Sequence, residues 1–432
     1  MHLSTRSYLI LALTAALAIA GLWSGDQLLV ALWRWPLALW LLAVALESLW
    51  IRQLRLVAQV ECAARAFLGR AHAVCFAFQN PSRRPVRLEY APATPLGFER
   101  LEATRLLIIA PQDVARDCLA LEPVRLGIQI WPDLPARVLG RFGLIWWSRP
   151  QTVSRRISVA PDVVSDARQR PEGATGGARP RRASGAGAEL HQLRAYVPGD
   201  PLARIDWKAS ARSGSLISRE FSEDQHLDVM VAVDAGRSSR VQAGALDRLS
   251  LYANVAARFA ATVARTDDRV GLIVYSDRVL AVSALERGRT ALVRVTRALE
   301  AVTASLAESD PLAAAIRIRA LLTRRSLVLL LTDVDDVSAA ESLARAVRLL
   351  SPPHLVVAAG VVNPELDELA RAPAREWGDA WIALAAQERE RSASRHRELL
   401  RRLGAPIIAA RQERLEQAVL DEYQFLRRAR RI

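Results

Sequence analysis

The chain is short of cysteine, and this shortage limits which stabilising devices it can use. It has three cysteines, Cys62, Cys75 and Cys118, with no CxxC spacing. An odd number without metal-ligand spacing predicts neither a disulfide framework nor a zinc site. We interpret the three as small buried side chains of a protein in a reducing compartment.

Lysine is almost absent, which changes how the net charge is interpreted. Lys208 is the only lysine, although 59 Lys+Arg face 45 Asp+Glu and the net charge is +14. Such an arginine bias, alongside many alanines, is what a GC-rich genome would impose. The arginines are scattered and form no basic stripe interleaved with aromatic residues. Nucleic-acid binding therefore fits the charge but lacks a recognition element.

Familiar catalytic motifs are missing as well. The sequence has no HExxH, GxSxG or Walker loop, and no paired histidines at ligand spacing. The dispersed histidines are typical of surface or capping residues: His191, His226, His354 and His396. We therefore expect a protein that is not an enzyme.

Two apolar runs stand at the N-terminus, Tyr8–Trp23 and Leu28–Ile51. Each is close to the roughly 20 residues that a helix needs to cross a bilayer. Arg6 precedes the first run, Arg52 and Arg55 follow the second, and an acidic residue lies between the runs. The positive-inside rule predicts a two-helix hairpin with both ends in the cytoplasm. The alternative is a signal peptide whose apolar segment is Leu9–Ala20.

Residues 56–165 have the pattern of a small β-rich domain. Short runs of β type, such as His72–Gln79 and Val86–Tyr90, are separated by proline-containing turns. This spacing predicts a sandwich or barrel. Residues 166–189 are rich in Arg, Gly, Pro, Ala and Ser. Because this composition cannot build a core, we expect a flexible linker there.

From residue 190 to 432 the pattern alternates between strand and helix. Leu227–Val233, Arg269–Tyr275 and Ser326–Leu331 are continuous apolar strands, as in a parallel sheet covered on both faces. Intervening segments are helix-periodic, and one is expected to begin with Ser309 as N-cap and Pro311 at the first position. The alternation predicts a doubly wound α/β sheet.

A dense polar block precedes the first of these strands. It contains Leu193-Arg-Ala-Tyr-Val-Pro-Gly-Asp200, then Arg204-Ile-Asp-Trp-Lys208, and ends near Arg219-Glu220. It resembles the signature of a bacterial membrane-protein family known as domain of unknown function fifty-eight. The hairpin, the turn Gly140-Arg-Phe-Gly-Leu144 and the C-terminal Asp421-Glu-Tyr-Gln-Phe-Leu-Arg extend the likeness. Ala195 departs from it, since an acidic residue is more usual there.

This resemblance implies a von Willebrand factor A-like α/β domain. It also implies a membrane-anchored cytoplasmic adaptor or assembly factor that works with a MoxR-type AAA+ ATPase at the bacterial inner membrane. The leading hypothesis is accordingly a multi-pass, non-enzymatic scaffold that binds proteins. The alternative is a hydrolase that uses Asp234, Asp333 and a metal-bound water.

Domains of the von Willebrand factor A type commonly hold Mg²⁺, and the resemblance implies candidate ligands here. They are Asp234, Ser238, Ser309 and Asp333. Hard oxygen ligands suit Mg²⁺. Yet Gly236 stands where the usual Asp-x-Ser-x-Ser loop has a serine, so one hydroxyl ligand is missing. Arg237 offers another way to neutralise the carboxylates of Asp234 and Asp333. We expect no cofactor, or weakly bound Mg²⁺.

The polar block allows two interpretations. In the structural one, the Val197-Pro-Gly-Asp200 turn gathers charged residues that lock the linker against the sheet, and Trp207 covers an edge of the core. In the functional one, the block docks the ATPase through arginine and tryptophan anchors. The candidate partner-binding residues are Arg194, Asp200, Arg204, Asp206, Trp207 and Arg212.

Overall fold

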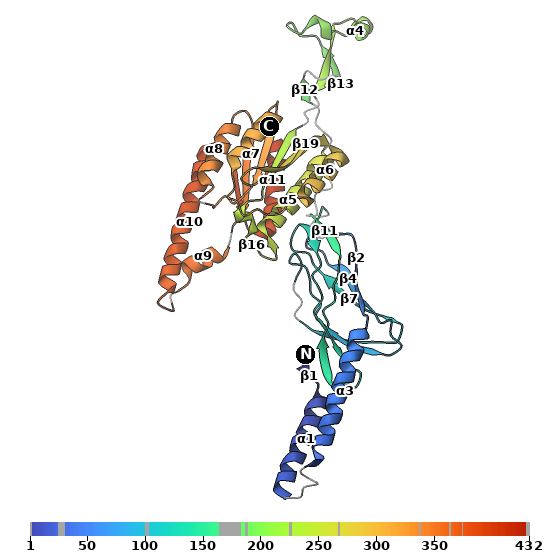
Figure 1. Ribbon diagram of the computed structural model, residues 1–432. Coiled ribbons are helices and arrows are strands. Elements are labelled where there is room, and N and C mark those ends of the chain that lie inside the picture. The colour runs from blue at the N-terminus through green and yellow to red at the C-terminus, as the bar shows by residue number, and fades with distance from the viewer. Residues whose placement is uncertain are drawn as a thin grey trace.

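The computed structural model has four parts arranged in line, a helical hairpin, a β domain, an α/β domain and a projecting arm (Figure 1). It describes residues 2–24, 31–99, 103–163, 183–185, 189–223, 227–266, 268–336, 338–362, 364–373 and 375–428. The loop expected between the apolar runs and most of the expected linker lie outside these residues. Residues 183–185 of that linker form a short strand.

The hairpin consists of α1 (Thr5–Ser24) and α3 (Arg34–Gln53). Both helices are long and apolar enough to cross a membrane, and few of their residues are buried by the rest of the chain. The prediction of two N-terminal apolar helices is therefore confirmed. The second helix, α3, lies within the apolar run Leu28–Ile51 for most of its length and ends two residues beyond it.

A buried carboxylate fastens the hairpin to the β domain. Glu47 of α3 is fully buried and accepts hydrogen bonds from the backbone N–H groups of Phe142 (2.7 Å), Leu144 (3.2 Å) and Ile145 (3.3 Å). From α1, the Ser7 hydroxyl donates to the carbonyl of Leu144 at 2.6 Å. Both helices thus hold the same turn, the Gly140–Leu144 segment that the sequence singled out.

The β domain is built from small, mainly antiparallel sheets. One has the order β1-β10-β9-β5-β6, and two others have the orders β2-β4-β7 and β3-β11-β8. The strands are β1 (His2–Leu3), β2 (Val57–Cys62), β3 (Arg65–Phe67), β4 (His72–Gln79), β5 (Val86–Tyr90), β6 (Arg105–Ile109), β7 (Val114–Leu121), β8 (Gly127–Ile130), β9 (Ala136–Leu139), β10 (Ile145–Ser148) and β11 (Arg156–Ala160). Aromatic side chains, including Phe76, Tyr90 and Trp131, fill the space between the sheets.

The expectation that the cysteines are three unpaired thiols is wrong. Cys75 of β4 and Cys118 of β7 are directly opposite each other in the antiparallel register and form a disulfide. They are 43 residues apart in the sequence. Sequence spacing carried no sign of this pair because only the register of the two strands brings them together. Cys62 is free.

The α/β domain is organised around a six-stranded sheet of order β19-β18-β15-β20-β21-β22. Its strands are β15 (Asp228–Asp234), β18 (Arg269–Tyr275), β19 (Val279–Arg287), β20 (Leu327–Leu331), β21 (Leu355–Val361) and β22 (Ile407–Ala410). All neighbouring pairs are parallel except β18 and β19. The prediction of a mostly parallel α/β sheet is confirmed.

Helices cover both faces of this sheet. One face packs on α5 (Arg248–Arg265), α6 (Gly288–Glu300) and α11 (Gln412–Arg428), and the other on α7 (Pro311–Leu321), α8 (Ala340–Leu350) and α10 (Asp379–Arg402). Alternate residues of β15, Val231 and Ala232, belong to the two different clusters. Complete burial of β15 explains its uninterrupted apolar sequence.

One local prediction fails in this domain, and one helix was not predicted. Asp310, not Ser309, caps α7 by accepting a hydrogen bond from the N–H of Leu312 at 3.1 Å. The sequence also gave no sign of α9 (Pro364–Arg371), a short helix that packs beside the N-terminal half of α10 (Figure 1).

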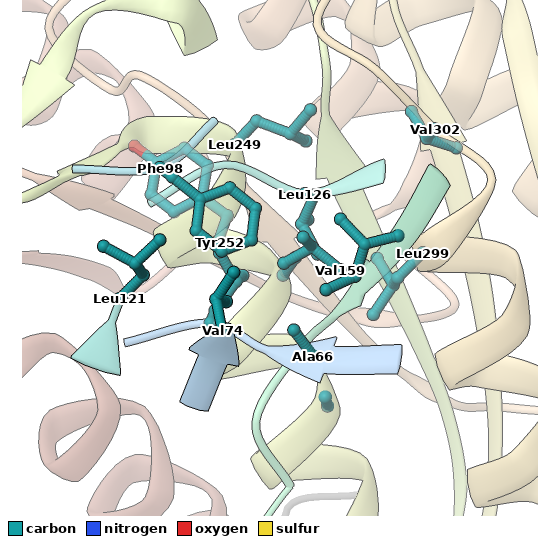
Figure 2. Close-up of a cluster of buried hydrophobic side chains, with 14 of the residues drawn as sticks. Ala66, Val74, Phe98, Leu121, Leu126, Val159, Leu249, Tyr252, Leu299 and Val302 are labelled. Carbon is teal, nitrogen blue, oxygen red and sulfur yellow. The ribbon is translucent and has the colours of Figure 1, made fainter. Parts of the chain in front are cut away.

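The β domain and the α/β domain share one hydrophobic cluster. Leu126 and Val159 of the β domain belong to it together with Leu249 and Leu299 of the α/β domain (Figure 2). Polar contacts reinforce this packing. The N–H of Leu126 donates to the Ser250 hydroxyl at 3.1 Å.

Asp162 is the main polar link at this junction. Its carboxylate pairs with Arg70 at 2.9 Å and with Arg258 of α5 at 3.1 Å, while its backbone N–H donates to Asn254 at 2.8 Å. Arg258 also pairs with Glu416 of α11 at 2.6 Å. The junction therefore holds the two domains in a fixed relation.

The polar block forms an arm that projects from the end of the molecule opposite the hairpin (Figure 1). It consists of β12 (Ala183–Gly185), β13 (Glu189–Ala195) and β14 (Ile217–Glu223), joined through η2 (Leu202–Arg204) and α4 (Trp207–Ser213). The expectation that Trp207 covers a core edge is wrong, because its side chain is 66% exposed.

We expect Gly140→Ala to lower the melting temperature of the full chain. A Cβ atom at Gly140 would lie 2.1 Å from the Glu47 Oε2 atom. Such overpacking typically costs about 1–3 kcal/mol of stability. Gly378→Ala is the matched control, because a Cβ there meets nothing within 4 Å. If the two variants melt at the same temperature in detergent, the proposed packing is contradicted. In a chain that already carries Glu47→Ala, Gly140→Ala should cause no further loss of stability, because the carboxylate that a Cβ would meet is gone.

Candidate functional site

The candidate site lies where the order of the sheet reverses, between β15 and β20. Val233 of β15 is paired in register with Leu331 of β20, so Asp234 and the Thr332-Asp333 pair follow at the same rim. Such a reversal point, at the carboxyl ends of parallel strands, is where open α/β sheets bind ligands. The structure therefore brings both predicted aspartates to one place.

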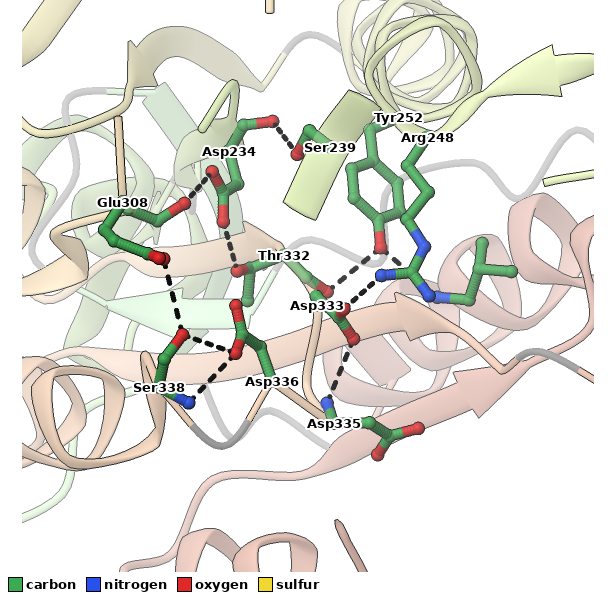
Figure 3. A network of polar contacts seen from close by, with 12 residues as sticks. Asp234, Ser239, Arg248, Tyr252, Glu308, Thr332, Asp333, Asp335, Asp336 and Ser338 are labelled. Atoms are coloured by element: carbon green, nitrogen blue, oxygen red, sulfur yellow. Dashed lines mark hydrogen bonds and ion pairs between the residues drawn. The ribbon is translucent and has the colours of Figure 1, made fainter. Parts of the chain in front are cut away.

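Asp234 is buried and its hydrogen bonds come from within the protein. One carboxylate oxygen accepts from the Ser309 hydroxyl at 2.6 Å and from the N–H of Gly236 at 2.8 Å. The other accepts from the Thr332 hydroxyl at 2.7 Å (Figure 3). Burial raises the pKa of Asp234, and the hydrogen bonds oppose that rise. With 1% of the residue exposed, it offers little surface to a ligand.

Asp333 has a buried cationic partner that the sequence did not reveal. The guanidinium of Arg248, at the start of α5, donates to its Oδ2 atom (Figure 3). Both side chains are almost completely buried. Nearby, the Tyr252 hydroxyl donates to the carbonyl of Thr332 at 3.1 Å. An internal arginine thus supplies the positive charge that two neighbouring carboxylates require.

The other predicted site residues are arranged differently from the expectation. Ser309 contacts Asp234, whereas the Ser238 hydroxyl is buried with no hydrogen-bond partner among the described residues. Its neighbour Ser239 donates to the backbone carbonyl of Asp234 at 2.8 Å. Arg237 pairs with Glu308 at 2.6 Å on the surface and does not neutralise the aspartates.

The residues present do not fit a Mg²⁺ site well. Ser309 already bonds to Asp234, Arg248 already bonds to Asp333, and a Cβ atom at Gly236 would lie 2.1 Å from the Ser309 hydroxyl oxygen. A cation would have to displace these contacts and would meet the Arg248 charge. The described residues contain no cluster of three His, Cys, Asp or Glu side chains suited to a metal.

Within the arm, the predicted partner-binding residues divide into two groups. Arg194 and Asp200 form a two-pronged ion pair with both distances at 2.8 Å, which closes the turn after β13. Asp206 caps α4 by accepting from the N–H groups of Lys208 and Ala209, and it also pairs with Arg219 at 2.9 Å. These contacts lower the pKa of both aspartates. They maintain the shape of the arm.

Two of the three remaining members of the set are exposed. Trp207, the first residue of α4, is largely exposed, and Arg212 at the other end of that helix is exposed too. Arg204 is half-buried in η2. Exposed Leu202 and Leu216 lie in the same arm, and sequence reasoning did not single them out. The arm therefore presents apolar and cationic side chains that its own fold does not use.

We expect Arg248→Met to destabilise the α/β domain by about 3–5 kcal/mol, because it leaves the Asp333 carboxylate buried without its cation. The melting temperature of the purified chain measures this loss. The double variant Arg248→Met with Asp333→Asn should recover part of the lost stability, since it removes the charge as well.

Two outcomes would contradict this account of the pair. The first is a single variant that melts like the wild type. The second is a wild-type melting temperature that rises with Mg²⁺ and falls with EDTA, which would mean that a metal, and not Arg248, stabilises the rim. We expect neither Mg²⁺ nor EDTA to change it.

Comparisons with known proteins find a family model that resembles part of the chain. No curated protein matches the chain. Among solved structures, a conserved hypothetical protein BatB from Bacteroides thetaiotaomicron is 15% identical, with a TM-score of 0.29 over 46% of this chain and 99% of that one. A CARDB domain from Pyrococcus furiosus, in complex with di-metal ions, is 10% identical, with a TM-score of 0.19 over 24% and 88%. These scores are too low to indicate a shared fold. The family model described as "Protein of unknown function DUF58" matches residues 192–402, which include most of the arm and most of the α/β domain.

Proposed function

We propose that the protein is a membrane-anchored, non-enzymatic adaptor that binds a protein partner through its projecting arm. The observation that carries this proposal is the arm itself. It exposes Trp207 and Leu202 on a small, internally braced structure that stands away from the rest of the molecule (Figure 1). Tryptophan and arginine are the residues most enriched among the energetic anchors of protein interfaces.

The composition of the arm suggests the chemistry of its partner. The outer part of the arm, Leu193–Arg219, has five basic residues against two acidic ones, while three Glu residues nearer its base bring the described arm to five of each. The two acidic side chains of the outer part are held in ion pairs within the arm. An acidic surface with an apolar groove would complement it, and electrostatic complementarity would speed association. From the family resemblance, we propose a MoxR-type AAA+ ATPase as this partner.

The contacts of the aspartates at the rim of the sheet favour the adaptor function over the alternative, a hydrolase. A hydrolytic carboxylate must reach a substrate or a metal-bound water. Asp234 accepts three internal hydrogen bonds, and Asp333 is bonded to a buried arginine. Both roles are structural in this arrangement. We further propose that the domain is von Willebrand factor A-like, with the Arg248 guanidinium in place of a bound cation.

We also propose that the soluble domains lie in the cytoplasm, where an AAA+ ATPase would meet them. Arg6 lies in the first turn of α1, Arg52 lies in the last turn of α3, and Arg55 follows it, in keeping with the positive-inside rule. Contacts of Ser4 and Ser7 with the Gly140–Leu144 turn favour a retained first helix over a cleaved signal peptide. The Cys75–Cys118 disulfide favours the opposite side, since disulfides persist in oxidising compartments.

We expect Trp207→Ala to weaken binding of the full chain in nanodiscs to a purified MoxR-type ATPase by about tenfold or more. The matched control is Phe425→Ala, because Phe425 is an aromatic residue that is 56% exposed but lies on α11, outside the arm. Biolayer interferometry with and without ATP would measure both affinities.

Unchanged melting of both variants would show that folding is preserved. If Trp207→Ala binds as tightly as the wild type, or if both variants weaken equally, the arm is not the docking surface. Absence of any ATPase binding by the wild type would remove the proposed partner.

We expect a cysteine at Ser215, an exposed position of the arm, to be protected from a membrane-impermeant maleimide in intact spheroplasts. Native cysteines would be replaced by alanine, and detergent lysis should make the site reactive. A cysteine added in a periplasmic reporter protein serves as the positive control. Labelling of Ser215→Cys before lysis would place the domains outside and agree with the disulfide instead.

A further inference from the structure

A second exposed apolar surface lies at the free end of the α9–α10 pair. Trp377, in the loop before α10, is 88% exposed, and Trp381 in the first turn is also largely exposed. Ile382 and Leu384 add two more exposed apolar side chains within three residues of Trp381. We call Trp377, Trp381, Ile382 and Leu384 the α10 tip. A cluster of large exposed apolar residues commonly marks an interaction site.

The α10 tip is held in shape by its neighbours. Asp379 accepts hydrogen bonds from the backbone N–H groups of Arg375 at 2.8 Å and Glu376 at 2.9 Å, which fixes the loop that carries Trp377. Gln387 of α10 donates to the carbonyl of Ala370 in α9 at 3.1 Å. The tip is therefore a built structure at the end of two packed helices.

The α10 tip points toward the same end of the molecule as the hairpin, whereas the arm points away from it (Figure 1). The junction around Asp162 and the shared hydrophobic cluster fix the α/β domain on the β domain. Glu47 in turn fixes the β domain on α3. The orientation of the tip is thus set relative to the two helices that are apolar enough to cross a membrane.

The charge around the α10 tip is balanced. Between Arg371 and Leu384 the basic residues are Arg371 and Arg375, and the acidic ones are Glu376 and Asp379. A surface that binds anionic lipid or an acidic protein by electrostatic attraction would carry an excess of basic residues, as the outer part of the arm, Leu193–Arg219, does. Two indole rings beside aliphatic side chains instead suit the boundary between headgroups and acyl chains, where tryptophan is enriched.

We propose that the α10 tip inserts into the surface of the lipid bilayer that the hairpin spans. The tip then acts as a second membrane contact, held by apolar burial of Trp377 and Trp381 and not by charge. A single contact of this size is weak by itself, but tethering through α1 and α3 keeps it close to the bilayer and raises its effective concentration. The insertion does not depend on the proposed adaptor function.

The test uses the full chain in single-copy nanodiscs of phosphatidylcholine. Cys62 is replaced by serine, and an environment-sensitive fluorophore is attached to Trp377→Cys, to Trp381→Cys or to Trp207→Cys. Trp207 is the matched control because it is an exposed tryptophan on the arm, at the opposite end of the molecule. Fluorescence is measured with and without brominated lipid, which quenches a probe that enters the bilayer.

The proposal expects stronger quenching at 377 and 381 than at 207, with emission shifted to the blue and no loss at high salt. Equal quenching at all three positions, or none at 377 and 381, would overturn it. Quenching that requires phosphatidylglycerol and disappears with salt would also overturn it, since it would mean attraction by charge. A blue shift that appears only when several copies share a disc would identify a second copy of the chain as the occupant. Melting of each labelled protein confirms that it is folded.

Discussion

The rest of the structure depends on the junction between the β domain and the α/β domain. Asp162 is buried there between Arg70 and Arg258, and Arg258 continues to Glu416 in the last helix. Breaking such a buried pair by removing one partner is costly, because the remaining charge is left without compensation. The hydrophobic cluster around these residues belongs to both domains. The direction set by the hairpin is therefore transmitted through the β domain to the sheet and the α10 tip.

Buried carboxylates serve the architecture at several points of the molecule. Glu47 satisfies three backbone N–H groups of one turn, and Asp234 satisfies two hydroxyl groups and one N–H group. Asp333 is neutralised by Arg248. Every one of these acids sits where chain segments distant in sequence meet. A buried acid at a strand end is thus compatible with a structural role, even at a position of the sheet where other proteins bind ligands.

Sequence reasoning recovered the elements whose pattern is local. The apolar runs of β15, β18 and β20 predicted the sheet because each strand is buried on both faces, and the N-terminal runs predicted the two long helices. Contacts across long separations could not be predicted. Arg248 and Asp333 are 85 residues apart, and nothing in either local sequence indicates the other. The strand register that pairs Cys75 with Cys118 arises only in the folded chain. The same holds for the contacts of the residues before α7, where Asp310 caps the helix and Ser309 donates a hydrogen bond to Asp234.

The arm and the α10 tip expose the same residue type but differ in charge, and this difference separates their proposed partners. The outer part of the arm, Leu193–Arg219, carries five basic residues against two acidic ones, although the described arm as a whole has five of each, whereas the tip is balanced. A tryptophan among unbalanced positive charges favours an acidic protein surface, while tryptophans in a neutral setting favour the interface of a bilayer. The two surfaces also point to opposite ends of the molecule (Figure 1). Seating the tip on the bilayer would therefore restrict how the α/β domain tilts and would hold the arm away from the membrane, where a soluble partner can reach it.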